Sequence, residues 1–406
     1  MTCKVERLST VNCDHFLSIR IPVSDQNWKE GTKPLVTISC ITYNHASYIH
    51  DALEGFLMQK TTFPIEILIH DDASTDGTAD IVRDYEKKYP KLILPIYQSK
   101  NQYSKGVKIS STYQFPRARG KYIAMCEGDD YWTDPLKLQK QVDFLEAHPE
   151  CSMCFHDVMV IADDGACVSL SYNSSSSRQI YTLDDILEKC FPQTCSVMFK
   201  NNLILAYPDW FYKIINGDWA LYVLLAQQGN IGYIEEKMAC HRLHTGGVWS
   251  PLSDVHKLKQ LLPLYGTFYK HVGQAHGVAI RAGASTIIAA CAAALYDSSD
   301  SNGLGMCLDF VKDTLKTAVD AGYYNRDFAR NTWAKSYERL GFAAYRKRDA
   351  KDTRYCFVRA LAFQPAFIAN TGILSLLFEA TFGKHISDYR KVLWSCMRAS
   401  LAKLRR

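Results

Sequence analysis

The sequence has no large excess of charge of either sign, and no stripe of basic residues interleaved with aromatic ones. Its 47 lysines and arginines stand against 42 aspartates and glutamates, a formal net charge of +5 over 406 residues. Proteins that bind nucleic acid usually carry a concentrated basic patch. We therefore expect no nucleic-acid partner.

Two common nucleotide-binding signatures are also absent. There is no Gly-x-Gly-x-x-Gly and no Gly-x-x-x-x-Gly-Lys-[Ser/Thr], which disfavours a dinucleotide site and a P-loop. The longest apolar stretch, residues 277–296, contains Arg281 and many small residues. Its composition predicts a packed helix rather than a membrane span.

No secretory signal is recognisable at the N-terminus, and the 14 cysteines do not form a metal-binding pattern. Cys151 and Cys154 make a Cys-x-x-Cys pair, but no second pair follows at zinc-ribbon spacing. Several other cysteines lie inside apolar runs, as buried free thiols do. We expect reduced cysteines and a cytoplasmic protein.

The length suits two domains with small additions. Up to about residue 255 short apolar runs alternate with helical patterns, and beyond it the composition becomes helical, rich in alanine and leucine. The expected parts are an N-terminal extension (1–33), an α/β domain (34–255), a helical domain (256–388) and a basic amphipathic helix (389–406).

The α/β domain opens with a β-α-β-α-β pattern. Apolar runs typical of buried strands occupy residues 34–44, 65–70 and 92–97, with amphipathic helices expected at about 46–59 and 78–89. This order predicts a parallel sheet with right-handed crossovers. Further strands are expected at 16–22, 153–161 and 193–199, with helices at 136–148 and 220–226.

The stretch from Lys121 to Pro135 carries the strongest chemical signal. An apolar strand, residues 122–126, ends in Glu127-Gly128-Asp129-Asp130. Carboxylates at the carboxyl end of a buried strand lie on the edge of the sheet where ligands bind in open α/β folds. Adjacent carboxylates repel each other, so a divalent ion such as Mg²⁺ or Mn²⁺ shared with a diphosphate is expected. The alternative is a solvated acidic turn.

At this point the sequence resembles the family 2 glycosyltransferases, which are inverting enzymes of the GT-A fold that use nucleotide-diphospho sugars. The resemblance covers about residues 34–250 and rests on five segments in order: VTISCITYNHASYIHDAL, ILIHDDASTDGTADIV, GKYIAMCEGDDYWTDPLKL, GDWAL and HRLHTGGVWS. It implies a Rossmann-like, mostly parallel sheet and a hexosyltransferase activity.

The resemblance also implies roles for individual residues. Thr42, Tyr43 and Asn44 would border the base and ribose, while Asp72, with Asp71 beside it, would hydrogen-bond the base of a UDP sugar. Asp129 would contact the ribose or the diphosphate, and Asp130 would ligate the metal. The family usually has Asp-x-Asp-Asp here, and Glu127 replaces the first aspartate.

Three further segments complete the expected site. Asp218 in Gly-Asp-Trp would be the general base, although it also suits a helix N-cap. His244 would ligate the metal or touch the diphosphate, with Arg242 as the alternative diphosphate partner. Lys105 or Lys108 would touch phosphate, or would be an ordinary solvated loop lysine.

The C-terminal third suggests partners. Tyr337, Leu340, Gly341, Phe357, Ala360 and Pro365 fall at the spacing of one tetratricopeptide repeat. This helix pair would serve internal packing, or protein docking or self-association. The basic helix 389–406 would lie on an anionic membrane surface, or would be solvated.

The sequence therefore predicts a metal-dependent inverting glycosyltransferase. It would move a sugar, expected to be UDP-linked, to a glycan or lipid-linked glycan in bacterial surface polysaccharide assembly (lipopolysaccharide, O-antigen or capsule). The alternative is a catalytically weak nucleotide-sugar-binding scaffold acting through the helical domain. A nucleotidyltransferase is disfavoured because TYNHASY stands where its Gly-rich loop would be.

Overall fold

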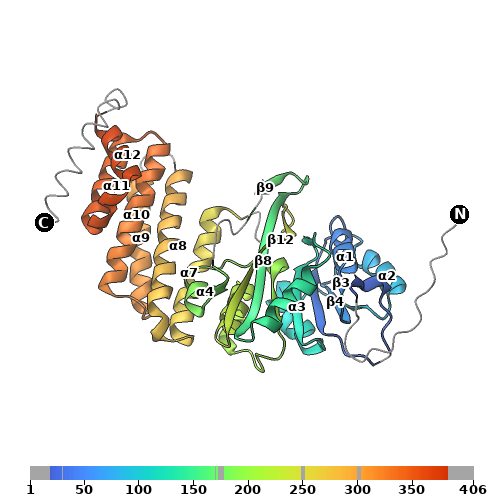
Figure 1. Ribbon diagram of the computed structural model, residues 1–406. Helices are drawn as coiled ribbons and strands as arrows, with labels where there is room; N and C mark the ends of the chain where they lie inside the picture. Colours follow the sequence, from blue (N-terminus) through green and yellow to red (C-terminus); the bar gives the residue numbers. More distant parts are fainter. Residues whose placement is uncertain are drawn as a thin grey trace. The chain divides into compact units, whose positions relative to one another are not determined.

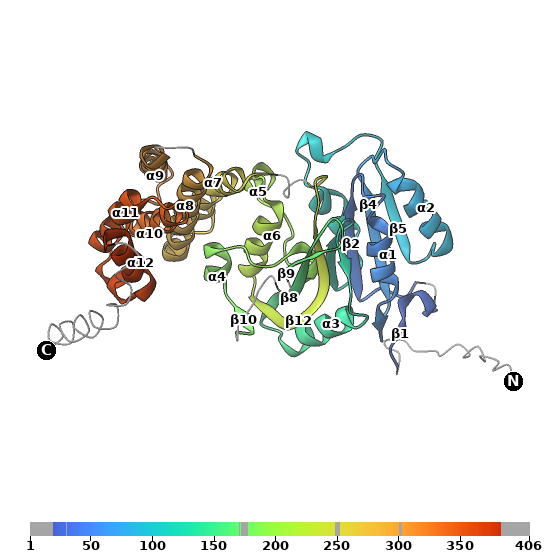
Figure 2. The same cartoon turned by 90° about the horizontal axis from the view of Figure 1, so that it is seen from above.

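The computed structural model describes residues 19–29, 31–169, 171, 178–247, 252–299 and 303–382. The chain forms two compact units, Met1–Pro251 and Leu252–Arg406. Figures 1 and 2 show an α/β architecture in the first and helices in the second. The expected helix 389–406 lies outside the described residues.

The first unit is built on a mixed, largely parallel sheet. Its main path runs β10-β12-β8-β11-β6-β2-β4-β5, with β7 on β12 and β9 on β8. The strands in chain order are β2 Val36–Thr42, β4 Ile65–Asp71, β5 Ile93–Tyr97, β6 Tyr122–Glu127, β7 Tyr131–Trp132, β8 Cys151–Ala162, β9 Cys167–Ser169, β10 Ile180–Tyr181, β11 Met198–Lys200 and β12 Asn230–Leu243. A separate pair joins β1 (Ile21–Pro22) to β3 (Lys60–Thr61).

The predicted β-α-β-α-β order is confirmed, because β2, β4, β5 and β6 are parallel neighbours. The connecting helices in chain order are α1 Ile49–Leu57, α2 Thr78–Lys88, α3 Lys137–Ala147, α4 Leu183–Glu188, α5 Asp209–Lys213 and α6 Gly217–Ala226. The strands β2, β4 and β6 are buried on both faces, which explains their near-continuous apolar sequences, whereas β5 is only partly buried.

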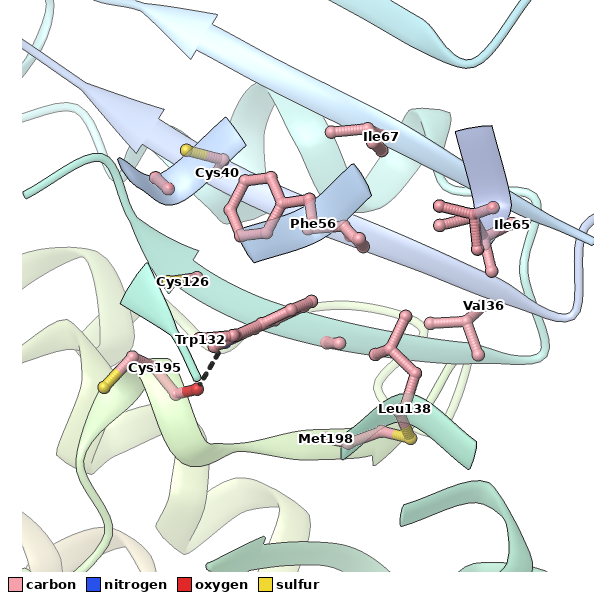
Figure 3. Packing of buried hydrophobic residues seen from close by; sticks show 14 of the residues in the cluster. Val36, Cys40, Phe56, Ile65, Ile67, Cys126, Trp132, Leu138, Cys195 and Met198 are labelled. Atoms are coloured by element: carbon pink, nitrogen blue, oxygen red, sulfur yellow. Dashed lines mark hydrogen bonds between the residues drawn. The ribbon is translucent and has the colours of Figure 1, made fainter. Parts of the chain in front are cut away.

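One face of the sheet carries the main apolar core. Val36 and Cys40 of β2 pack with Phe56 of α1 and Leu138 of α3, as Figure 3 shows. The fully buried Trp132 lies at their centre, with its ring 4.8 Å from that of Phe56 and its Nε1 donating to the Cys195 carbonyl at 2.8 Å. This packing fixes the turn after β6, which contains the acidic residues of interest.

One predicted strand, residues 193–199, needs correction, and one strand was not predicted. Residues 194–196 form a 3₁₀ turn, in which Ser196 Oγ bonds to the Gln193 carbonyl, and the strand β11 starts only at Met198. The long strand β12 was missed because its pattern is broken where the pairing with β8 shifts register between Ile234 and Ala239. An irregular strand does not show a clean two-residue period.

Lys137 provides a test of this core. Its side chain is fully buried, its Nζ donates to Gln141 Oε1 at 2.6 Å, and it lies 3.9 Å from the Trp132 ring centroid. Burial lowers its pKa from 10.5 to about 8. Between these two pKa values Lys137 is protonated in the unfolded chain and neutral in the folded protein. The free energy of unfolding therefore rises as pH rises through this range.

We expect the free energy of unfolding of the wild type to rise relative to that of Lys137→Met by about 2–3 kcal/mol between pH 7 and pH 10. Urea titrations of both proteins at the two pH values measure this, because other buried groups titrate alike in both. The exposed Lys91 supplies the control Lys91→Met, whose difference from wild type should not change with pH. If the difference in free energy of unfolding between wild type and Lys137→Met were the same at both pH values, the lowered pKa of the buried Lys137 would be contradicted.

The second unit consists of helices, listed here in chain order: α7 Asp254–His271, α8 Gly277–Ser298, α9 Gly303–Asp320, α10 Arg326–Arg346, α11 Ala350–Phe363 and α12 Thr371–Phe382. Helix α8 packs against α7, α9 and α10 through residues such as Ile280, Ala284 and Ile288, which are fully buried. Its small residues let neighbouring helices approach closely.

One helix in the described part of the chain, Gln274–Ser298, is long and apolar enough to cross a membrane by length and composition. Its mean hydropathy is 1.8, and 56% of the apolar window is buried inside the protein. The core helix of a globular domain meets the same criteria, so the finding is weak evidence for a span.

Helices α10 and α11 form the helix pair that contains the repeat-like residues. Gly341 of α10 faces the ring of Phe357 of α11, and a Cβ at position 341 would lie 2.6 Å from Phe357 Cε1. Phe357 is fully buried. The two helices therefore approach each other where a side chain would not fit.

Gly341→Ala is expected to lower the free energy of unfolding by ~1–2 kcal/mol, because overpacking costs more than the gain in helix propensity. Gly305→Ala in α9 is the matched control, since a Cβ at Gly305 meets nothing within 4 Å. It should stabilise or leave stability unchanged in the same chemical denaturation experiment. Equal behaviour of the two variants would refute the close approach at Gly341.

Candidate active site

The carboxyl ends of β2, β4 and β6 lie side by side at one edge of the sheet. Thr42 pairs with Asp71 across β2 and β4, and Ile41 pairs with Glu127 across β2 and β6. The turn after β6 presses on β2 at Gly128, where a Cβ would lie 2.8 Å from Thr42 Oγ1. The three polar strand ends thus meet at one edge, as their positions in the sequence predict.

Several polar atoms at this edge are buried without a partner. Within the described residues, Thr42 Oγ1, His45 Nδ1 and Asp71 Oδ1 make no hydrogen bond. A buried polar atom left unpaired costs about 1–3 kcal/mol. The edge is therefore suited to a polar ligand that supplies the missing hydrogen bonds.

Asp72, the residue expected to recognise the base, is buried and holds a loop. Its Oδ1 accepts from the backbone N–H of Gln102 at 2.8 Å, and its Oδ2 accepts from that of Tyr103 at 2.9 Å. Each carboxylate oxygen has a second lone pair, so a further donor can bind. Tyr43 is 43% exposed, so its ring is available for stacking.

Asn44 joins the loops after β2 and β4. It has a left-handed backbone with φ 55°, its N–H donates to Ser74 Oγ, and its Oδ1 accepts from Thr75 N–H, both at 2.9 Å. These contacts shape the edge from within. Asn44 therefore has a structural role here, beside the nucleotide contact that the resemblance implies.

Asp129 lies in a cluster with two histidines. Its Oδ2 is 3.0 Å from His244 Nε2 and 3.6 Å from His45 Nε2. One ligand atom from each of these residues lies within 4.8 Å of the others. Burial opposes ionisation of Asp129, but the hydrogen bond from His244 and the charge of His45 lower its pKa overall.

The other two carboxyl groups of the turn after β6, those of Asp130 and Glu127, have different surroundings. Asp130 is buried, with His241 Nδ1 3.1 Å from both of its oxygens and the Arg242 N–H donating to its Oδ1 at 2.8 Å. It therefore ties the turn after β6 to β12. Burial and the charges of Asp130 and Asp129 raise the pKa of Glu127.

Arg242 is already engaged by protein groups. Its Nη2 donates to Asp51 Oδ2 at 2.9 Å, and its guanidinium lies 4.9 Å from the Tyr48 ring centroid. Together with Asp163 it borders an open hollow of about 480 Å³, which Ser47, Tyr48 and Asp164 also line. The Tyr48 ring lies 4.7 Å from that of His244, so this hollow adjoins the His45–Asp129–His244 cluster.

Asp218 stands in the first turn of α6, where its side chain is partly exposed to solvent and closely surrounded by protein groups. Burial raises its pKa, while backbone N–H groups of the helix and the charge of Lys108 oppose the rise. Its charge in turn raises the pKa of Glu127. Asp218 therefore lies within electrostatic reach of the acidic end of β6.

The candidate Lys105 and two further residues have different surroundings. Lys105 is exposed in the short 3₁₀ turn Tyr103–Lys105. His156 is fully buried in β8, where its Nδ1 lies 2.8 Å from the Asp157 carbonyl oxygen, so it belongs to the core. Thr194 bonds to Glu127, which places it beside the acidic strand end.

Sequence reasoning missed His45 and Tyr48. Both follow β2 in the segment TYNHASY, and the signal that could have revealed His45 is its position directly after a polar strand end. Its proximity to His244, almost two hundred residues later in the chain, depends on the position of β12 in the sheet, because His244 directly follows that strand.

The largely parallel sheet and its acidic, histidine-containing edge define a nucleotide-diphospho-sugar transferase fold of GT-A type. Residues 37–201 match the family model described as Glycosyl transferase family 2. This part of the chain is therefore a family 2 glycosyltransferase domain, as the motifs indicated.

Two curated relatives and one solved structure illustrate the match. The chain is 44% identical over 214 residues to the uncharacterized protein Rv1520 of Mycobacterium tuberculosis, covering 53% of this chain and 60% of that protein. It is 33% identical over 172 residues to the putative teichuronic acid biosynthesis glycosyltransferase TuaG of Bacillus subtilis, covering 42% and 63%. The chain thus spans less than two thirds of the length of either relative.

The solved structure is S. aureus TarS 1-349 in complex with UDP-GlcNAc. It aligns with a TM-score of 0.51 and 18% identity, covering 81% of this chain and 92% of that one. At this identity the likeness concerns the fold alone.

Proposed function

We propose that this protein is a metal-dependent inverting glycosyltransferase that transfers a sugar from a UDP-linked donor to a hydroxyl group of a glycan or lipid-linked glycan. The observation that carries the proposal is the cluster of His45, Asp129 and His244 at the sheet edge where β2, β4 and β6 end. Asp72 at the end of β4, and Asp218, whose charge raises the pKa of Glu127, support it. The family 2 domain and the name of TuaG support a role in surface polysaccharide assembly.

The donor nucleotide would bind over β2 and β4. A ring N–H of the base would donate to the Asp72 carboxylate, and the exposed Tyr43 ring would flank the base or ribose. Thr42 Oγ1 and Asp71 Oδ1, which have no partner among the described residues, would complete the polar contacts. This arrangement needs no Gly-rich phosphate loop.

His45, Asp129 and His244 would hold the metal ion. Two imidazole nitrogens and a carboxylate oxygen gathered within 4.8 Å form a donor set that suits a borderline ion such as Mn²⁺, or Mg²⁺ with more water ligands. The geometry favours Asp129 over Asp130 as the carboxylate ligand, because Asp130 is committed to His241 and to the Arg242 N–H. When bound, the ion would stabilise the charge of the departing diphosphate.

Asp218 would act as the general base. As the acceptor oxygen bonds to the anomeric carbon and the bond to the diphosphate breaks, the hydroxyl proton passes to the Asp218 carboxylate. Inversion requires the base on the face of the sugar opposite the leaving group. Burial raises the pKa of Asp218, which makes the carboxylate a stronger base than one in water.

A donor panel tests the proposal. Purified protein with Mn²⁺ and each of several UDP, GDP and TDP sugars is assayed for nucleoside diphosphate release, with and without short glycan acceptors. We expect release from a UDP sugar, enhanced by an acceptor. Binding of UDP without turnover under any condition would favour the alternative, a nucleotide-sugar-binding scaffold.

We also propose two partners beyond the donor and the acceptor. Residues 389–406 would contact an anionic membrane that carries a lipid-linked acceptor on its cytoplasmic side. The α10–α11 pair would offer a surface for another protein or a second copy of this chain, because Tyr355 and Val358 of α11 are exposed.

A further inference from the structure

The Lys108 side chain binds the backbone just before α6, the helix that carries Asp218. Its Nζ donates to the Ile214 carbonyl at 2.5 Å and to the Ile215 carbonyl at 3.1 Å. A Cβ on Gly217 would lie 3.3 Å from the same Nζ, so the lysine side chain rests on the residue that precedes Asp218. The side chain thus holds the turn from which α6 starts.

The backbone of Lys108 is itself fixed. Its carbonyl accepts from Thr112 N–H at 3.0 Å and from Ser111 Oγ at 3.2 Å. A few residues earlier, the same loop is held by Asp72 through the N–H groups of Gln102 and Tyr103. One loop therefore connects the residue expected to bind the base with the residue expected to accept the proton.

Charged and titratable groups from several elements face Asp218. They are Lys108 and Tyr103 of the loop, Glu127 of β6, Cys190 after α4 and Tyr222 one turn along α6. The cation among them is Lys108. Burial raises the pKa of Asp218, and Lys108 counteracts this by favouring the ionised carboxylate.

We propose that Lys108 is a positioning residue for the general base: it fixes the Ile214–Gly217 turn and directs its positive charge at the Asp218 carboxylate. The inference rests on the proposed function of Asp218. Two of the three N–H donors of Lys108 are engaged by the backbone carbonyls just before α6, so its hydrogen bonds hold the segment that carries Asp218.

The test uses Lys108→Met, which keeps most of the aliphatic stem but removes the charge and the donors. We expect kcat for UDP release to fall roughly 10-fold, with the Kd for UDP in Mn²⁺ changed less than about twofold. The acid limb of the kcat–pH profile should move to higher pH by up to roughly one unit, because the carboxylate loses its neighbouring cation.

Two comparisons separate this role from a merely structural one. Lys108→Arg should hold the acid limb at its wild-type position, because it keeps the charge. Adding Lys108→Met to Asp218→Asn should lower kcat by less than about a further twofold. A residue that acts through the Asp218 carboxylate has no effect on kcat once that carboxylate is replaced. The control is Lys100→Met, an exposed lysine of the same segment, which should behave as wild type.

A higher Kd for UDP with an unmoved acid limb would overturn the proposal and make Lys108 a phosphate contact. An equal shift of the limb in Lys108→Arg would overturn the role of charge. If the wild type releases no nucleotide from any donor, the proposed function fails separately. The Lys108 assignment is then tested by ¹³C NMR titration of the Asp218 carboxyl group in wild type and Lys108→Met, and an unchanged pKa would refute it.

Discussion

Asp218→Asn is expected to lower kcat for sugar transfer by ~10²–10⁴-fold, because an amide cannot take the proton of the attacking hydroxyl. Asparagine keeps the size of the side chain and can still accept hydrogen bonds from the backbone N–H groups of α6. Donor binding should therefore persist. The measurement is steady-state UDP release with acceptor, together with the Kd for UDP.

A matched control distinguishes chemistry from helix capping. Asp209 is likewise exposed in the first turn of a helix, the short α5, but it does not belong to the acidic edge described above. Asp209→Asn should keep nearly full activity. If Asp218→Asn also turns over at the wild-type rate, Asp218 serves the helix alone and another group is the base.

The second large effect concerns the metal. Asp129→Asn is expected to lower kcat/KM in Mn²⁺ by roughly 10²-fold or more, corresponding to about 3 kcal/mol or more of lost charge stabilisation at the diphosphate. Asp130→Asn should cost much less, because its Oδ1 can still accept from the Arg242 N–H. Both variants are assayed for UDP release over a range of Mn²⁺ concentrations.

The variants Asp129→Asn and Asp130→Asn also decide which carboxylate of the Glu-Gly-Asp-Asp turn binds the metal. The family resemblance assigns the metal to Asp130, whereas the cluster of Asp129 with His45 and His244 favours Asp129. A large loss in Asp130→Asn and a small one in Asp129→Asn would contradict the assignment made from the geometry. Circular dichroism of both variants excludes loss of the fold as the cause.

The nucleotide-binding half of the sheet was predictable because its signals are local. The strands β2, β4 and β6 are buried on both faces, so each shows as a short apolar run that ends in polar residues. The strand β12 was not predictable in this way. It carries exposed Glu235 to Lys237 at an irregular register shift, and its place beside β8 is a tertiary property.

The same distinction holds at the candidate site. Asp72 and Asp218 could be named from short motifs, because strand ends and helix starts place them. The choice between Asp129 and Asp130 could not be made from sequence, since adjacent carboxylates face different neighbours. It depends on β12, which brings His241 to Asp130 and His244 to Asp129. His45 completes the cluster only once that strand is in place.

The most direct test of the account is the binding of UDP to the wild-type protein by isothermal titration calorimetry, with Mn²⁺ and with EDTA. If the acidic edge and His244 hold one ion together with the diphosphate, UDP should bind at least about 10-fold more tightly with Mn²⁺, a difference of about 1.4 kcal/mol. The gain should disappear in Asp129→Asn. Equal UDP affinity with Mn²⁺ and with EDTA would contradict the shared metal and diphosphate site.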